Sequence, residues 1–216
     1  SFLYAQIFKL NLAKTFNYSP QKSIVNYLFS FLKIRVLYMG NSYITNFPFF
    51  FFTKKYDLSD FIYHNNLVWT AFIVPDFLMT HLTNKKKHPF FKLEVEENMV
   101  LDIYKNWMGL DCYLNSIKSK YKKKINHILR NSKDISIRII QVDDFNVFSN
   151  EIQILFNAIT RSSKFNGPTF NTRTYLSLID KNYARLYGYF LNNKLIAFSS
   201  EFIDGQDIYS HYVGFN

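Results

Sequence analysis

Three extended, apolar-rich runs close the sequence, and two short turn signals separate them. Residues 184–191 and 194–203 flank Asn192-Asn193, and Asp204-Gly205 precedes a third run over 207–215. Asn, Asp and Gly adopt the left-handed backbone that two-residue hairpin turns require. Consecutive runs joined in this way pair as neighbours, so the sequence predicts a three-stranded antiparallel meander at its end.

A long amphipathic helix is expected upstream of the meander. Its apolar residues recur at steps of three and four, which indicates one apolar stripe. The stripe consists of Leu114, Ile117, Tyr121, Ile125 and Ile128. Asp111 is the expected N-cap, because its carboxylate can accept from the first free N–H groups of the helix.

The segment between this helix and the meander predicts one strand and two more helices. Residues 135–141 are β-rich, Asp143 or Asp144 is suited to begin a helix, and 171–180 has helical character. From residue 134 the expected order is therefore strand, helix, helix and three antiparallel strands. This order is typical of an α/β fold.

The first part of the chain predicts a different order of elements. We expect strand, helix, strand, helix, strand and strand, over residues 2–12, 20–32, 34–39, 58–65, 67–74 and 90–103. Residues 106–110 lie between the two patterns and form the best boundary. We therefore expect two units, 1–105 and 106–216.

Composition excludes several classes of protein. Of the 216 residues 48% are hydrophobic, and 24 Phe with 16 Tyr supply a core, which excludes a disordered tail. Cys112 is the single cysteine, so a disulfide scaffold is excluded and a reducing cytoplasmic setting fits. The five His are scattered and no metal-ligand spacing is present, so we expect no metal. No segment has the pattern of a secretory signal or a membrane span.

The order of the expected strands and helices, together with several motifs, resembles the GNAT acyltransferase superfamily. The resemblance is to its FemAB-like branch, which acts in peptidoglycan biosynthesis and contains tandem GNAT units. The segment YLNSIKSKYKKK at 113–124 resembles "YLxSLxxKYRKR", GYFLNNKLIAF at 188–198 resembles "GYFxxGKLVGF", and HYVGF at 211–215 resembles the end of the fourth strand. Lys122 stands where that basic segment often has Arg. The resemblance implies that 106–216 holds the front half of one unit and 1–105 the back half of a preceding unit. It implies a fragment in which both units are incomplete.

The resemblance implies an N-acyltransferase that moves an acetyl or aminoacyl group to an amine or a cell-wall precursor. The donor is acyl-CoA, acetyl-CoA for example, or aminoacyl-tRNA. The family's glycine-rich pyrophosphate loop is missing at 13–21, so we expect the first unit not to bind CoA in the usual way. The alternatives are a non-catalytic module that binds an anionic or cell-wall precursor ligand, and a decayed gene product.

Acyl transfer needs a proton acceptor for the amine, an oxyanion donor and a proton source for the thiolate. The resemblance places the oxyanion donor at a backbone N–H of the fourth strand. Glu201, His211 and Tyr212 are the candidate base and acid. Alternation predicts one face with Leu195, Ala197, Ser199, Glu201 and Ile203, and another with Tyr209, His211 and Val213, opposite Ser210, Tyr212 and Gly214. The alternatives are a solvated Glu201 and a His211 that packs in the core.

Basic residues supply the candidate substrate-binding groups. No acid lies between Asp111 and Asp134, and the formal net charge is +10. Cations here could hold the phosphates of CoA, a nucleotide sugar or tRNA. The candidates are Lys120, Lys122, Lys124, Arg161 and Lys164. A solvated helix face is the alternative, and codon bias towards Lys explains part of the charge. No RNA-binding signature is present, so we expect no sequence-specific readout and no DNA partner.

Overall fold

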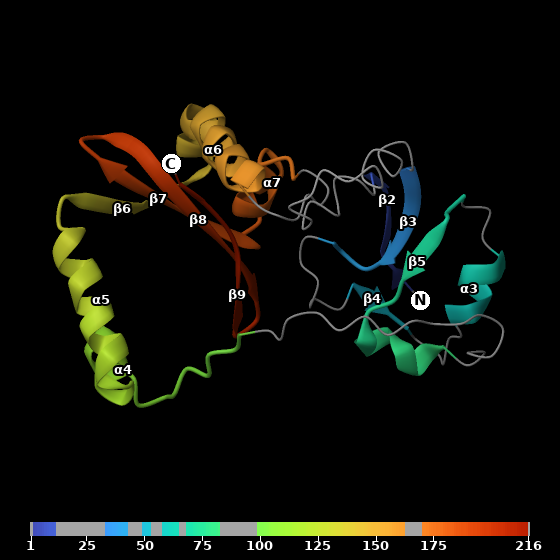
Figure 1. Ribbon diagram of the computed structural model, residues 1–216, viewed down its shortest axis with the longest axis horizontal. Coiled ribbons are helices and arrows are strands. Elements are labelled where there is room, and N and C mark those ends of the chain that lie inside the picture. The colour runs from blue at the N-terminus through green and yellow to red at the C-terminus, as the bar shows by residue number, and fades with distance from the viewer. Residues whose placement is uncertain are drawn as a thin grey trace, which may run out of the picture.

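A computed structural model describes the chain over seven stretches of residues. They are 2–11, 33–42, 49–52, 58–64, 68–82, 99–162 and 170–215. The strands in these stretches form three separate sheets, of two, three and four strands. Together with the helices they make an α/β fold, as the sequence predicts (Figure 1).

The four-stranded sheet is antiparallel throughout and has the order β6-β7-β8-β9. Its strands are Ile135–Ile139, Ala184–Leu191, Lys194–Asp204 and Asp207–Phe215. Asn192 and Asn193 both have positive φ, at 49° and 62°, as a two-residue hairpin turn of type I′ requires. Gly205 has φ of 58° in the next turn. The predicted meander is confirmed.

Two helices between β6 and β7 cover one face of this sheet (Figure 1). They are α6, Val142–Ser162, and α7, Thr174–Asp180. Asp144 accepts a hydrogen bond from the N–H of Gln141 at 3.2 Å, which ties the first turn of α6 to the residue before it. The order strand, helix, helix and three strands is confirmed.

The covered face, here called the inner face, holds a core rich in aromatic residues. Phe145, Phe156, Tyr175, Phe190 and Phe198 are almost completely buried in one cluster with the aliphatic residues of α6 and the sheet. The opposite, outer face carries apolar residues that remain exposed. Among them are Ile137, Ile139, Val213 and Phe215.

Two β-bulges shift the alternation that the sequence predicts. In β8, Leu195 pairs with Phe190 and Ala197 with Tyr189, so Ile196 is extra and Leu195 turns to the inner face. The prediction that Leu195 shares a face with Ala197 is therefore wrong. A bulge adds one residue to one strand and reverses the phase of everything beyond it.

The second bulge is in β9, where His211 and Tyr212 together face the single residue Ser200. Before the bulge Tyr209 packs inward, and after it Gly214 does. His211 and Tyr212 consequently lie on the same inner face, where both rings contact Phe170. The prediction that these two residues lie on opposite faces of the strand is wrong.

The predicted long helix is broken into two. The helix α4 spans Leu110–Ser116 and α5 spans Ser119–Asn131, while Ile117 and Lys118 are extended. The hydroxyl of Ser116 donates to the carbonyl of Tyr113 at 2.7 Å, a side-chain bond that competes with helix continuation. Gly109 stands at the N-cap position and Asp111 lies in the first turn, so the predicted cap is also wrong.

The described residues of the first part form two small sheets with one helix. The two-stranded sheet pairs β1, Phe2–Leu3, with β4, Phe50–Phe51. In the other, β3 runs antiparallel to β2 and parallel to β5. The bounds are Ala5–Asn11 for β2, Lys33–Met39 for β3, Ala71–Ile73 for β5, Leu58–His64 for α3 and Asp76–His81 for a 3-10 helix.

The predicted strands near 2–12, 34–39 and 67–74 and the helix near 58–65 have counterparts here. The predicted helix 20–32 and the glycine-free junction 13–21 lie outside the described residues. So does most of the predicted strand 90–103, and its described end at 99–103 has no strand. Residues 99–109 carry neither helix nor strand, but this does not test the proposed division into units.

Candidate functional site

A hydrogen-bonded cluster on the inner face joins α7, β8 and the β9 bulge. The hydroxyl of Tyr175 lies 2.7 Å from the Ser200 hydroxyl and 2.8 Å from Nδ1 of His211. The Ser200 hydroxyl also accepts from the backbone N–H of Tyr212 at 2.9 Å and donates to the Tyr212 carbonyl at 3.1 Å. One serine therefore satisfies the peptide groups that the bulge takes out of the ladder.

One arrangement of hydrogens in this cluster fixes which nitrogen of His211 carries the proton. When the single Ser200 hydrogen is donated to the Tyr212 carbonyl, Tyr175 is the donor at the contact between the two hydroxyls. In that arrangement the Tyr175 oxygen accepts from His211, and Nδ1 holds the hydrogen. In the neutral imidazole the lone pair is therefore on Nε2.

Aromatic rings surround this cluster. The His211 ring lies 4.6 Å from the Phe202 ring, 4.1 Å from Tyr212 and 5.5 Å from Phe170, measured between centroids, and its Nε2 is buried. Burial raises the pKa of Tyr175 well above its usual value, the Ser200 hydrogen bond lowers it, and the nearby Tyr212 raises it further. Tyr175 therefore remains a neutral phenol at physiological pH.

The structure brings together two of the three predicted catalytic residues. His211 and Tyr212 are neighbours on the inner face because of the bulge. Glu201 points to the outer face, where it lies opposite Arg185 on β7 and Ser210 on β9. The separation prevents Glu201 from acting on the same atoms as His211, and its catalytic role stays a prediction.

The predicted substrate-binding cations lie on two helices. Lys120 and Lys124 are exposed on α5, and the Lys122 ammonium donates to the Asn115 side chain at 2.6 Å, which ties α5 to α4. Arg161 is exposed in the last turn of α6. Lys164 lies outside the described residues.

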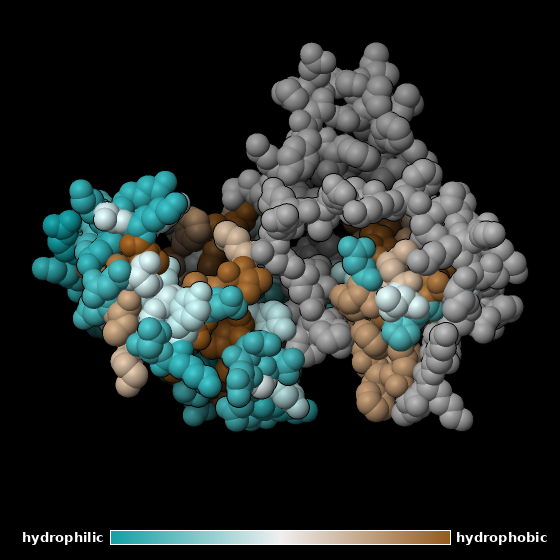
Figure 2. Space-filling model, turned by 90° about the horizontal axis from the view of Figure 1, so that it is seen from below, coloured by the Kyte–Doolittle hydropathy of each residue, from teal (hydrophilic) through white to brown (hydrophobic). Residues whose placement is uncertain are grey.

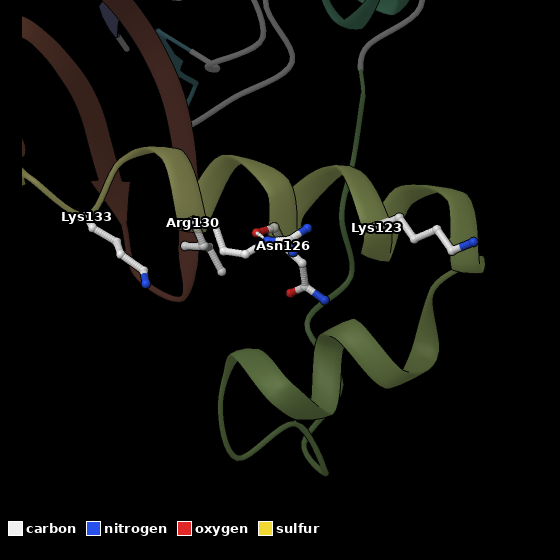
Figure 3. Close-up of a pocket in the computed structure, with 5 residues that line it drawn as sticks. Lys123, Asn126, Arg130 and Lys133 are labelled. Carbon is white, nitrogen blue, oxygen red and sulfur yellow. Dashed lines mark hydrogen bonds between the residues drawn. The ribbon is translucent and has the colours of Figure 1, made fainter.

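A hollow of about 500 Å³ lies along the polar side of α5. Lys123, Asn126, Leu129, Arg130 and Lys133 line it, and Figure 3 shows Lys123, Asn126 and Arg130 spaced along α5 with Lys133 just beyond its end. Three cations and an amide favour an anion at this place. The three cations lie in the acid-free segment between Asp111 and Asp134, but none of them belongs to the predicted binding set.

Tyr175 and Ser200 were not predicted as site residues. Ser200 has a weak signal in the sequence, because it is a polar residue between Phe198 and Phe202 on an apolar face. Its exposed fraction is only 1%, so its hydroxyl needs partners inside the protein. Tyr175 has no such signal, since its role depends on where α7 meets the sheet.

Two further observations bear on the class of site. Among the described residues, no three His, Cys, Asp or Glu side chains gather closely enough to hold a metal ion. The helices of the described part include none with the length and apolarity to cross a bilayer. Comparison with known protein families found no family model that matches the chain, and comparison with curated proteins found no significant relative.

Proposed function

We propose that the chain is an N-acyltransferase of the GNAT type, with its reaction centred on His211. The observation that supports this most directly is the bulge in β9. It sets His211 and Tyr212 side by side on the strand to which the resemblance assigns the oxyanion donor. The order of elements over 135–215 is the order that the resemblance implies for the front half of such a unit.

In this proposal His211 is the proton acceptor. The amine nitrogen attacks the carbonyl carbon of the donor, the new C–N bond forms, and the bond to the leaving sulfur or ester oxygen breaks. The amine proton passes to Nε2 of His211, which is buried in this structure and has to be uncovered for the transfer. Tyr175 holds the ring in place by accepting from Nδ1, and Tyr212 is the proton source for the leaving group.

The proposed donor is acyl-CoA or aminoacyl-tRNA, and the acceptor is a small amine or a cell-wall precursor in the cytoplasm. Both donors are polyanions, which the net charge of +10 favours. The proposed tandem organisation, with incomplete units at 1–105 and 106–216, rests on the same resemblance. The cations of α5 and Arg161 are the groups proposed to meet the phosphates.

A second candidate is a non-catalytic module of the same fold that binds an anionic ligand. The burial of His211 Nε2 among aromatic rings favours this candidate, because a buried imidazole nitrogen is typical of a structural histidine. Both candidates use the basic residues for binding, and they differ in whether turnover depends on His211.

The test is transfer of radiolabel from acetyl-CoA, and separately from aminoacyl-tRNA, to a panel of primary amines. Replacing His211 by Gln is expected to lower kcat by about 10²–10⁴-fold, the usual contribution of a general base. The matched control is His127→Gln, at an exposed histidine whose side chain bonds Asn131 at 2.9 Å. This control is expected to keep full turnover.

Three outcomes separate the alternatives. Loss of turnover in His211→Gln with ligand binding kept supports the proposal. Loss in Glu201→Gln alone moves the base to the outer face and contradicts the assignment to His211. Tight binding of CoA or tRNA without any turnover in the unsubstituted chain supports the binding module.

A further inference from the structure

The segment 99–131, here called the α4–α5 arm, exposes more apolar surface than a helix packed in a core does. It contains the connecting residues 99–109 with α4 and α5. Val100, Ile103, Met108 and Leu110 are all exposed. Contiguous apolar surface of this kind marks an interaction site.

The apolar stripe of α5 is present but unburied. None of the residues of α5 is buried: Tyr121 and Ile128 of the stripe are exposed, and Ile125 is half-buried. A stripe that the sequence would assign to the core therefore faces outward. Figure 1 shows α4 and α5 on the side of the four-stranded sheet away from α6 and α7.

Cations border this stripe on both sides. At 100° per residue, Lys120 and Lys124 flank it on one side and Lys122 on the other. Long Lys side chains can lie along apolar surface while their ammonium groups reach the polar layer beyond. The cations of the hollow, Lys123 and Arg130, occupy the opposite side of the helix.

The connecting segment adds an aromatic group to the same arm. The Trp107 ring lies 5.0 Å from the ring of Tyr104 and 5.1 Å from that of Tyr113 on α4, so the segment is fastened to the helix. Trp and Tyr are the residues that favour the boundary between lipid and water. Figure 2 shows hydrophilic and hydrophobic residues side by side over the half of the molecule that carries the arm and the sheet.

We propose that the α4–α5 arm docks on the surface of an anionic lipid bilayer, with α5 lying in the plane of the interface. The charge of α5 fits this occupant, because no acid interrupts its cations, and the two acids of the arm, Asp102 and Asp111, lie on the connecting segment and α4. The bilayer accommodates the exposed Tyr121 and Ile128 while the anionic headgroups meet the lysines. A nucleic acid would engage the same lysines but leave the apolar stripe in water, so the bilayer accounts for more of the surface.

The test measures co-flotation of the full chain with vesicles of phosphatidylcholine alone and of phosphatidylcholine with 30% phosphatidylglycerol. Each Lys replaced by Gln on the arm should weaken binding to the anionic vesicles by ~5-fold, so the pair Lys120→Gln and Lys124→Gln should weaken it by about 25-fold. The control pair is Arg173→Gln and Lys181→Gln, at exposed cations that flank α7 on the other face of the sheet. It should leave binding within about twofold.

The role of the apolar stripe can be tested against a control residue with the same exposed fraction. Ile128 in α5 and Ile208 in β9 are both 52% exposed. Ile128→Asp should weaken vesicle binding by more than roughly tenfold, and Ile208→Asp should not. Tyr121→Ser, at another exposed stripe position, repeats the test if Ile128→Asp does not fold. With Trp69→Phe, which leaves Trp107 as the only tryptophan, emission should shift to the blue on binding.

Each contrary result overturns the proposal. Equal binding to neutral and anionic vesicles, or none to either, removes the anionic bilayer as the occupant. If a single-stranded RNA competes fully and Ile128→Asp has no effect, the arm binds nucleic acid instead. If Ile128→Asp changes the mass of the particle in solution and not its vesicle binding, the stripe is a contact between copies of the chain.

Discussion

The two faces of the four-stranded sheet follow the same apolar alternation, but helices cover only one of them. On the inner face Phe190 and Phe198 are almost fully buried under α6 and α7. On the outer face Ile137 and Val213 occupy equivalent positions and remain exposed. The comparison teaches that alternation fixes which side chains share a face, while burial depends on what packs against that face.

The two faces also differ in the kind of polar group they hold. The inner face contains Tyr175, Ser200 and His211, bonded to one another inside the core. The outer face has Glu201 opposite Arg185, in a half-exposed setting. Polar groups in a packed core must find fixed partners, so the inner face is where precise geometry for chemistry can be maintained.

The largest expected effect comes from truncating one large side chain on each face. Phe198→Ala should lower the free energy of unfolding by about 3–5 kcal/mol, because the cavity it leaves is enclosed by the core. Ile137→Ala should lower it by less than about 0.5 kcal/mol, since the side chain is already exposed. Urea unfolding measures both. Equal losses would show that the outer face is also packed, and Phe198→Leu is the variant to use if Phe198→Ala does not fold.

Much of this sheet could be predicted from local sequence. The turn at Asn192-Asn193 depends on two residues that tolerate positive φ, so a short window is enough. The helix start near Asp144 is local as well. The β9 bulge could not be predicted from a short window, because it is held by Ser200 on the neighbouring strand, whose hydroxyl bonds the N–H and the carbonyl of Tyr212.

The hydrophobic periodicity of the sequence does not reveal the break between α4 and α5, for a physical reason. The apolar step from Leu114 to Ile117 and then to Tyr121 keeps helical spacing across the extended residues. A pattern of hydrophobicity therefore continues where the backbone does not. Among site residues, His211 and Tyr212 could be found by residue type, but Tyr175 becomes a partner only through the packing of α7.

A second prediction compares a glycine on the packed inner face with a glycine in open surroundings. A Cβ on Gly214 would lie 2.3 Å from Cε1 of Phe198 and 2.9 Å from the Leu155 backbone carbon. Gly214→Ala should therefore cost about 1–3 kcal/mol of stability, as overpacking does. Gly109, before α4, has no heavy atom within 4 Å of the same position and has extended φ, so Gly109→Ala should be nearly neutral. A neutral Gly214→Ala would mean that β9 can move away from α6.

The smallest expected effect concerns alkaline pH and the inner cluster. Burial raises the pKa of Tyr175, so the folded protein keeps the phenol proton when the unfolded chain, with a pKa near about 10, begins to lose it. The contribution of Tyr175 to the free energy of unfolding is therefore fully present below about pH 10. It falls as the pH rises further, by about 1 kcal/mol between pH 10 and 11.

Tyr175→Phe removes the ionisable group and should flatten this decline by that amount, at the expense of the contacts to Ser200 and His211. Urea unfolding at several pH values from 8 to 11 measures the difference in slope. Burial also raises the pKa of Tyr38 on β3, so Tyr38→Phe is the control, and its effect should be smaller because Tyr38 is only half-buried. If the slope of Tyr175→Phe equals that of the unsubstituted chain, then Tyr175 ionises as readily in the folded state as in the unfolded one. The inner cluster would in that case be open to solvent, and the contrast between the two faces would be smaller than the packing indicates.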